Sequence, residues 1–260
     1  MKKTFVMADP HGAYEAIVQC LNRSEFNKGV DELIVLGDVC DGWHETKRCI
    51  DLLLEIEATY IIGNHDEWTL DWMETGNAPR IWTQQGGIYT IKSYMPEVSE
   101  FFHGDYVKPE GIPQSHIDYL RNAYLFLEDE INGKKCLFVH GGFDFFRGIE
   151  NTSRNEMMWN RDLMARALQN EVIARKSNTK PKDFPFYDEI FIGHTTTETL
   201  GRKCEQVGLD GSKPVKACNV WLLDQGAGWS GYLSIMNIET KEFYMSDKVS
   251  TLYPDVKGRE

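Results

Sequence analysis

The sequence lacks the features of disulfide-rich secreted proteins, of cysteine-ligated zinc sites and of membrane-spanning proteins. Its six cysteines are scattered and include no C-x-x-C pair, which is typical of reduced, mostly buried thiols. Cys204 and Cys218, which flank the hairpin-like stretch GLDGSKP, are the pair that could meet in space. No stretch approaches the roughly 18 apolar residues of a membrane span. Asp9 interrupts the apolar run Thr4–Ala8, leaving it too short for a signal peptide. We therefore expect a cytoplasmic protein with no membrane partner.

Basic residues are scarce relative to acidic ones. The chain has 28 Lys and Arg against 40 Asp and Glu, a formal net charge of -12. This charge argues against a long nucleic-acid partner, because binding many phosphates requires a basic face. A small phosphorylated substrate is still compatible with it, because a bound cation can reverse the local field.

Internal repeats and low-complexity tracts are missing as well. Hydrophobic residues make up 42% of the chain and charged residues 26%, as in ordinary soluble globular proteins. A length of 260 residues suits one large α/β domain with a sizeable core. We expect residues 1–260 to form a single domain.

What the sequence does contain is a set of five short apolar runs that end in polar side chains. They lie in the segments TFVMADPHG, ELIVLGDVCDG, YIIGNHDEW, KCLFVHGG and EIFIGHTT. Each run is rich in Val, Ile, Leu and Phe without clean alternation, which is typical of strands buried on both faces. Helix-like patterns at about 13–26 and about 45–57 separate the first three runs. This order predicts an α/β fold of layered, mainly parallel or mixed β-sheets flanked by helices.

Other segments are expected to decorate this core, at about 76–124 and about 171–188. Residues 78–97 are expected to form a loop over the site. Residues 112–124 are expected to form a helix with Pro113 in its first turn and Ile117, Leu120 and Tyr124 facing inward. Strands are predicted from Val220 onward, with a hairpin turn at 239–241.

The polar side chains at the strand ends form a predicted metal-binding set. In parallel sheets, ligand sites lie outside the carboxyl ends of the strands, so the five ends should meet at one rim. One such turn alone is commonly a helix cap or a satisfied histidine, but five in one chain favour a shared site. Histidines with carboxylates and an amide oxygen suit Mn²⁺, Fe or Zn²⁺, and two such ions promote displacement at phosphorus. The candidate ligands are Asp9, His11, Asp38, Asn64, His140 and His194.

The motifs D-x-H-G, G-D-x-x-D, G-N-H-D, H-G-G and G-H-T, in this order, resemble those of the calcineurin-like metallophosphoesterases. The phosphoprotein phosphatase branch, with its bacterial and phage relatives, is the most similar. Three further segments are similar to segments of that branch: QQGGIYTIKSY, MMWNRDLM and the C-terminal LLDQGAGWSGYLSIMNIETKEFYMSD. The resemblance covers most of the chain and implies the layered sandwich fold of that superfamily.

The resemblance also implies the roles of individual residues. A first metal ion would be held by Asp9, His11 and a bridging Asp38, and a second by Asp38, Asn64, His140 and His194. Both would be divalent, with Mn²⁺ preferred and Fe, Zn²⁺, Ni²⁺ or Co²⁺ as alternatives.

In the family mechanism, a hydroxide between the metals attacks phosphorus. His65 then protonates the leaving oxygen, with Asp41 holding its ring. Arg161 would contact the phosphate, and Asp66 fits the first turn of the following helix.

One departure from the family pattern concerns phosphate binding. The branch usually reads G-D-x-V-D-R-G, but here GDVCDGW places Gly42 and Trp43 after Asp41, so that arginine is missing. Trp43 could cap the core or form an aromatic floor for a substrate. His44, His103 and His116 lie away from strand ends and are expected at the surface. Substitutes for the arginine could come from Lys47, Arg48, Arg80 or Arg147, each of which is more often a surface charge.

The expected activity is a two-metal phosphoesterase that hydrolyses phosphomonoesters, of the serine/threonine protein phosphatase type. One alternative is a hydrolase of dinucleoside polyphosphates or other small phosphoesters. Another is a metal-site scaffold that binds proteins without catalysis. The expected partner is a phosphorylated protein or a small phosphoester. The sequence specifies neither the native metal nor an oligomeric state.

Overall fold

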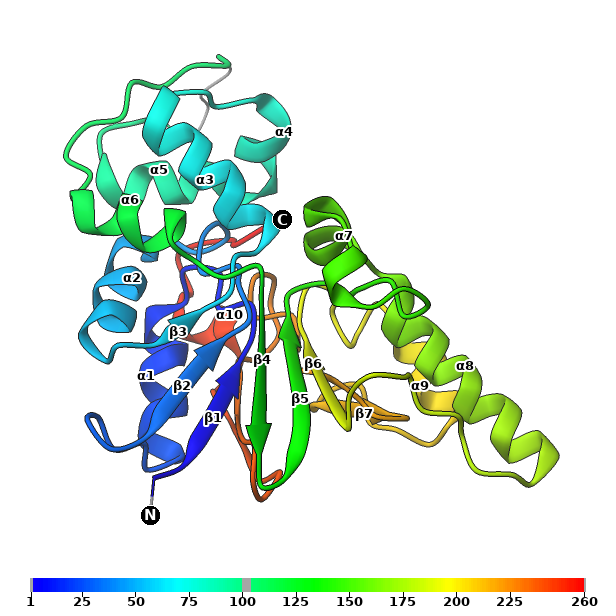
Figure 1. Ribbon diagram of the computed structural model, residues 1–260. Coiled ribbons are helices and arrows are strands. Elements are labelled where there is room, and N and C mark those ends of the chain that lie inside the picture. The colour runs from blue at the N-terminus through cyan, green and yellow to red at the C-terminus, as the bar shows by residue number, and fades with distance from the viewer. Residues whose placement is uncertain (1, 100–103, 260) are drawn as a thin grey trace.

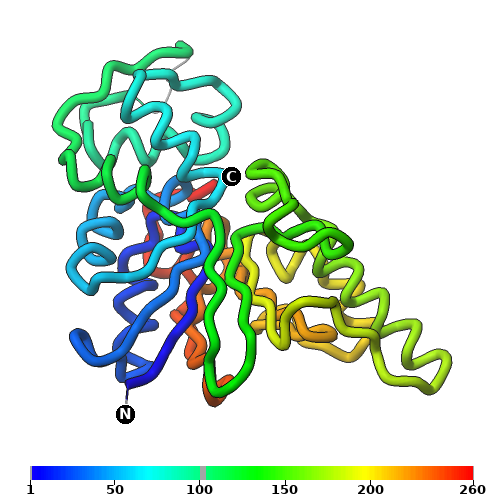
Figure 2. The backbone as a smooth tube through the Cα atoms, viewed as in Figure 1, coloured from blue at the N-terminus to red at the C-terminus, as the bar shows by residue number. Residues whose placement is uncertain are grey.

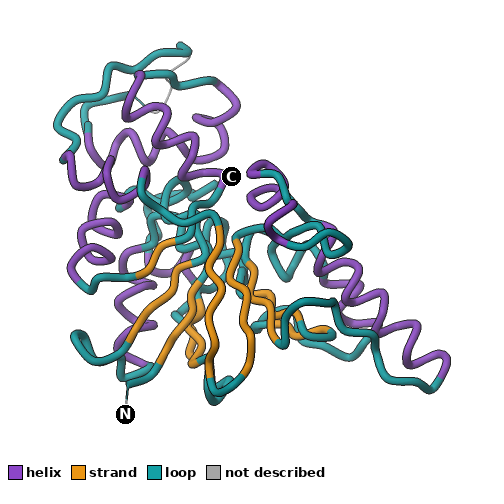
Figure 3. The backbone as a smooth tube through the Cα atoms, viewed as in Figure 1, coloured by secondary structure: helices purple, strands orange, loops and turns teal. Residues whose placement is uncertain are grey.

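The computed structural model describes residues 2–99 and 104–259. It contains two five-stranded sheets. Figure 3 shows that helices flank them on both sides. His103, which was expected at the surface, lies outside the described residues.

The first sheet has the strand order β10-β9-β1-β2-β3. Its centre is parallel and consists of β1 (Thr4–Met7), β2 (Glu32–Val35) and β3 (Thr59–Tyr60). The hairpin of β9 (Ser234–Asn237) and β10 (Phe243–Met245) adds to it in antiparallel fashion. This confirms the predicted turn at 239–241.

The second sheet has the order β4-β5-β6-β8-β7. Strands β5 (Lys134–Val139), β6 (Glu189–Ile192) and β8 (Val220–Leu222) are parallel. Strands β4 (Phe126–Ile131) and β7 (Val215–Ala217) join them antiparallel at the two edges. The predicted layered α/β fold with mixed sheets is confirmed.

The strands are buried on both faces, which explains their unbroken apolar runs. Along β1, Val6 faces the other sheet, whereas Phe5 and Met7 belong to the core beneath the helices. Between the sheets, Phe138 and Phe191 stack with ring centroids 5.0 Å apart. The arrows of β1, β2 and β5 all point toward the upper edge of the sheets in Figure 1, so these parallel strands end on the same side.

Helices cover the outer face of each sheet. Helices α1 (Tyr14–Arg23) and α2 (Thr46–Glu55) confirm the two predicted from the sequence, and α10 (Val249–Leu252) lies beside α1. On the second sheet lie the 3-10 turn η2 (Ile149–Asn151), α7 (Arg154–Trp159), α8 (Asp162–Ser177) and α9 (Gly201–Gln206).

A helical group lies above the first sheet (Figures 1 and 2). It comprises α3 (Asn64–Thr75), α4 (Arg80–Trp82), η1 (Thr83–Gly87), α5 (Ile88–Tyr94) and α6 (Gln114–Arg121). The prediction of a loop at 78–97 was therefore wrong. Gly86, at φ +102°, kinks the helical path without ending it, and Trp82 and Ile91 pack inside.

The predicted helix at 112–124 forms as the shorter α6, and the structure differs from the prediction at Pro113 and at Tyr124. Pro113 is its N-cap, directly before the first turn. Leu120 is buried and Ile117 is partly buried against the core. Tyr124 lies beyond the helix end and is 56% exposed, so its inward placement was wrong. It bridges to Ile61 instead, beside β3.

The surface prediction was wrong for one histidine and correct for another. His44 is exposed, whereas His116 is buried. Its ring nitrogens lie 2.8 Å from the Tyr94 hydroxyl and 2.9 Å from an Asp51 oxygen. A buried imidazole is tolerated there because both nitrogens have partners.

All six cysteines are free and buried, so Cys204 and Cys218 form no disulfide. Among the described residues, no helix combines the length and apolar character needed to cross a membrane.

Candidate metal centre and active site

The turns after the parallel strands have an unusual backbone. Asp9, His11, Asp38, Asp41 and His194 all have positive φ, between 48° and 67°. This left-handed conformation costs non-glycine residues roughly 1–2 kcal/mol each and clusters at functional sites. Hydrogen bonds between successive turns hold it, such as His11 N–H to the Asp38 carbonyl at 2.9 Å.

Two groups of potential metal ligands share one carboxylate. Asp9, His11 and Asp38 form the first group, and Asp38, His140 and His194 the second. Within each group the ligand atoms lie within 4.8 Å of one another, and all five residues are buried. The structure thus brings together residues from strands of both sheets, at the rim predicted from the sequence.

Asn64 completes the predicted set. Asn64 is the first residue of α3, and its Oδ1 lies 3.1 Å from Nε2 of His140. Its amide oxygen therefore faces the second group, where the family resemblance places it.

The histidine tautomers leave lone pairs directed at this cluster. Nδ1 of His140 lies 2.6 Å from the Leu36 carbonyl, and Nδ1 of His11 lies 2.8 Å from the Cys40 carbonyl. A carbonyl accepts hydrogen bonds, so Nδ1 carries the proton and Nε2 is left to coordinate. Nε2 of His194 is buried with no hydrogen-bond partner among the described residues. The donor set therefore fits divalent cations.

The electrostatics of the cluster also favour a bound cation. Burial and the neighbouring Asp224 carboxylate raise the pKa of Asp9 well above its usual range. Burial lowers the pKa of His140, but the charge of Asp38 outweighs it and raises that pKa to about 10, so a bound cation would displace a proton from its Nε2. Crowded, buried carboxylates are unfavourable without a compensating cation.

Two motif glycines make room for these carboxylates. Gly63 and Gly193 both lie outside the left-handed region, so they are not required for backbone freedom. A Cβ on Gly63 would overlap the Asp38 carboxylate, and one on Gly193 would overlap that of Asp9.

His65 and Asp41 form a buried pair beside the cluster. Nδ1 of His65 lies 2.7 Å from Asp41 Oδ2, and the His65 backbone N–H donates to Asp38 Oδ1 at 2.9 Å. Asp41 also accepts from Trp82 Nε1 at 2.7 Å and Thr90 Oγ1 at 2.9 Å. Burial raises the pKa of Asp41 to about 8 and lowers that of His65 to about 3.

Asp66 lies in the first turn of α3, as predicted, and also braces the neighbouring turn. Its carboxylate accepts from the backbone N–H groups of Gly63 and Asp38, both at 2.8 Å, and from the Tyr60 hydroxyl at 2.6 Å. These contacts fix the turn that carries Asp38.

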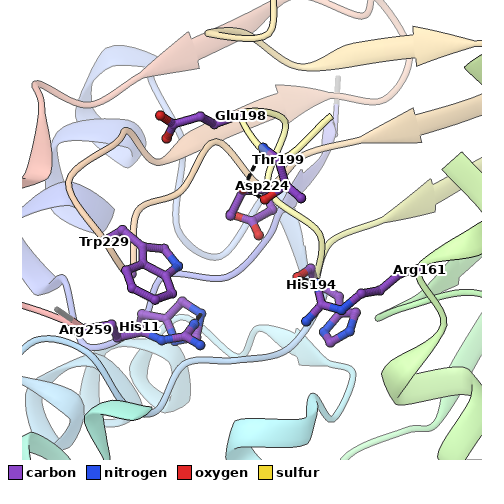
Figure 4. A pocket seen from close by; sticks show the side chains of 10 residues that line it. His11, Arg161, His194, Glu198, Thr199, Asp224, Trp229 and Arg259 are labelled. Atoms are coloured by element: carbon purple, nitrogen blue, oxygen red, sulfur yellow. Dashed lines mark hydrogen bonds between the residues drawn. The ribbon is translucent and has the colours of Figure 1, made fainter. Parts of the chain in front are cut away.

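A cavity of about 290 Å³ opens next to the ligand groups. Arg161 lines it from the N-cap of α8, and its Nη1 donates to the His194 carbonyl at 3.3 Å. Figure 4 shows Arg161 and His194 on one side of the cavity and His11 and Arg259 on the other.

Asp224 and Arg259 were missed by the sequence reasoning. Asp224 is buried and lies two residues after β8, so it had the same strand-end signal as the predicted ligands. Arg259 lies in the chain that follows α10, where no local pattern marked it.

The four basic residues considered for the missing arginine lie elsewhere. Arg48 pairs with Glu45, and Arg147 pairs with Asp144 at 2.6 Å. Neither these two nor Lys47 or Arg80 is among the described residues that line the cavity. Trp43 is buried, stacks on Tyr253 with centroids 5.1 Å apart and donates to the Ala227 carbonyl at 2.7 Å. It caps the core and offers no floor to a substrate.

Comparison with known proteins agrees with this arrangement. The family model described as "Calcineurin-like phosphoesterase" matches residues 2–208. The chain belongs to the calcineurin-like phosphoesterase family. As a member of this metallophosphoesterase family it is a metal-dependent hydrolase of phosphoesters.

Two similar relatives are bacterial enzymes named serine/threonine-protein phosphatase 2. The one from Salmonella typhimurium is 23% identical over 198 residues, covering 74% of this metallophosphoesterase and 82% of the relative. The one from Escherichia coli is 24% identical over 210 residues, covering 81% and 87%.

Solved structures share the fold. A candidate diadenosine tetraphosphatase aligns with a TM-score of 0.60 at 16% identity, covering 94% of this chain and 92% of the other. A metallophosphoesterase from Sphaerobacter thermophilus aligns with a TM-score of 0.51 at 16% identity, covering 95% and 89%.

Proposed function

We propose that this protein is a two-metal phosphoesterase that hydrolyses phosphomonoesters, of the serine/threonine protein phosphatase type. The observation that carries the proposal is the pair of ligand groups sharing Asp38, with the His65–Asp41 pair directly beside them. The similarity to bacterial serine/threonine-protein phosphatases supports the substrate class.

Asp38 would contact both cations, which are divalent and for which Mn²⁺ is the preferred candidate. Fe, Zn²⁺, Ni²⁺ and Co²⁺ suit the same donors. When bound, such ions polarise phosphoryl oxygens and lower the pKa of water. In the first site Asp38 would act with Asp9 and His11. In the second it would act with Asn64, His140 and His194.

The other residues act on the substrate. His65 donates a proton to the leaving oxygen while its Nδ1 stays hydrogen-bonded to Asp41, which keeps the ring in place. Arg161 binds the phosphoryl oxygens from the side of the cavity where it lies beside His194. The substrate is a phosphorylated protein or a small phosphoester, and the protein acts in the cytoplasm as a single domain of residues 1–260.

A second candidate function, hydrolysis of dinucleoside polyphosphates, is favoured by an aromatic pair. The rings of Trp68 and Trp159 lie 5.3 Å apart. The ring centroid of Trp68 lies 5.3 Å from that of His65, and the ring centroid of Trp159 lies 5.9 Å from that of His194. Half-buried indoles in this position could stack a nucleobase.

A substrate panel on manganese-loaded protein tests the proposal. We expect phosphoserine and phosphothreonine peptides to be hydrolysed faster than dinucleoside tetraphosphates. The reverse order would overturn the ranking. Complete absence of p-nitrophenyl phosphate turnover with Mn²⁺, Ni²⁺, Co²⁺ and Zn²⁺ would instead favour a non-catalytic scaffold.

A further inference from the structure

The chain after α10 returns to the active site, as the red segment in Figure 2 shows. Tyr253 anchors it by stacking on Trp43 and by donating its hydroxyl to Glu45 at 2.6 Å. Gly258 is buried, and its φ of +68° fits glycine. A Cβ on Gly258 would lie 3.1 Å from the Trp43 ring, so this segment packs closely on the core.

This path delivers the Arg259 side chain to the cavity. Its backbone N–H donates to the Gly228 carbonyl at 3.3 Å. Its guanidinium lies 4.9 Å from the Trp229 ring and donates to Gln85 Oε1 at 3.3 Å. Nη1 lies 3.0 Å from Nε2 of His11. Nε is buried without a hydrogen-bond partner among the described residues, so the guanidinium has donor capacity left for a ligand.

The position of Arg259 is complementary to that of Arg161. Both line the same cavity, Arg161 beside His194 and Arg259 beside His11, as Figure 4 shows. They are the two permanently charged cations among the described residues of its lining, in a protein of net charge -12. A phosphoryl group placed over the ligand cluster would lie between two guanidinium groups.

The local packing shows why Arg259 can reach this place. A Cβ on Gly86 would lie 3.0 Å from Cγ of Arg259 and 3.0 Å from Cα of Gly42. Arg259 thus passes close to Gly42, the position from which the family's usual arginine is missing. A Cβ on Gly42 would lie only 3.1 Å from the Cβ of His11, so a side chain at this position would crowd His11.

We propose that Arg259 is a second phosphate-binding residue, which holds the phosphoryl group of the substrate opposite Arg161. The identity of the substrate rests on the proposed function, whereas the binding of a phosphate anion does not. A cation held by Nε2 of His11 would take the lone pair that Nη1 of Arg259 contacts. Metal binding would therefore release that N–H for the phosphate.

The test measures the affinity of manganese-loaded protein for inorganic phosphate by calorimetry. Arg259→Gln should weaken binding roughly 10- to 100-fold, the range for a charge-assisted hydrogen bond. The phosphate affinity of Arg259→Lys should lie between those of the wild type and of Arg259→Gln, because an ammonium group keeps the charge but lacks the paired donors of a guanidinium. Lys257→Gln is the matched control. It removes an exposed charge from the same segment outside the cavity and should leave the affinity unchanged.

Metal content is measured on each protein, and we expect Arg259→Gln to retain the wild-type amount. Phosphate affinity within about twofold of wild type in Arg259→Gln would overturn the proposal. Loss of metal in that variant would also overturn it, since Arg259 would then support the metal centre. If the wild-type protein binds phosphate but hydrolyses no phosphoester, the proposed function fails, while the comparison of affinities still decides the role of Arg259.

Discussion

Asp38 is the residue on which both halves of the site depend. One carboxylate oxygen accepts the His65 N–H at 2.9 Å, and the other lies 3.4 Å from Nε2 of His140 and 3.8 Å from Nε2 of His11. The side chain is 2% exposed, so its charge is little screened by water.

We expect Asp38→Asn to reduce activity more than Asn64→Ala. A charge-assisted contact contributes about 1.5–3 kcal/mol, and Asp38 would make one to each of two cations, whereas Asn64 is a neutral ligand of one. Bound metal and kcat/KM of both variants check this order. Two metal ions and a near-normal rate in Asp38→Asn would show that the bridging assignment is wrong.

His65→Asn should leave both metals bound, because His65 is not a ligand in the proposed site. The rate should fall roughly 10²- to 10⁴-fold for an alkyl phosphate, whose leaving oxygen needs a proton. The loss should be distinctly smaller for p-nitrophenyl phosphate, because p-nitrophenolate departs largely unaided. Rates with a series of leaving groups measure the difference. Equal losses for all of them would assign His65 a structural role.

At the residue scale, the site residues that could be predicted from the sequence are those that directly follow a strand. Asp9, His140 and His194 were predictable because each follows an apolar run, and parallel strands bring such ends together. Asp224 carried the same signal and was overlooked. Arg259 carried none, because its place depends on the packing of Gly258 on Trp43 and on its own contacts with Trp229 and Gly228, all distant in sequence.

At the scale of elements, the segment α4–η1–α5 matters most to the proton donor. It was predicted as a loop, but its helical form lets Trp82 and Thr90 both donate to the Asp41 carboxylate. The prediction failed because glycine pairs usually break helices, whereas here packing against Trp72 and the rest of the core stabilises the kinked path. Strands and amphipathic helices such as α1 were predictable because their periodicity is local.

Trp82→Phe should therefore affect catalysis as well as stability. It removes one donor from a buried carboxylate, and we expect a loss of about 1–3 kcal/mol in the free energy of unfolding. The dependence of rate on leaving group should become steeper, because Asp41 holds the ring of His65 less firmly. Chemical denaturation and leaving-group series measure the two effects.

Trp72→Phe is the matched control, because Trp72 is equally buried and its Nε1 donates to the Val107 carbonyl at 2.9 Å. The Trp72→Phe variant should have a lower free energy of unfolding, but its rate should depend on the leaving group as in the wild type. The same change in both variants would attribute the effect of Trp82 to general loosening of the helical group.

At the scale of the whole molecule, the site lies at the seam between the two sheets. Asp9 and Asp38 follow strands of one sheet, while His140 and His194 follow strands of the other. Buried carboxylates at this seam repel one another, and a bound cation would relieve that repulsion and link the two halves.

Metal removal should therefore lower the stability of the whole protein. At a free metal concentration about 100 times Kd, each site contributes about 2.7 kcal/mol. For a chain of this length that corresponds to a shift in Tm of about 5–10 °C. Calorimetry with Mn²⁺ and with a chelator measures the shift, and Asp38→Asn should show a smaller one. Identical melting in both conditions would mean that the seam does not bind metal.

The overlap between the motif glycines and the carboxylates gives these motifs a further meaning. Gly63 is required by Asp38, and Gly193 by Asp9, across the boundary between neighbouring turns. Each glycine is thus coupled to an acidic residue far away in the chain, and the two positions should vary together among relatives. A relative that has lost the carboxylate at position 9 is free to carry alanine at position 193. Glycine at position 193 in a relative therefore indicates that position 9 carries, or has carried, a carboxylate.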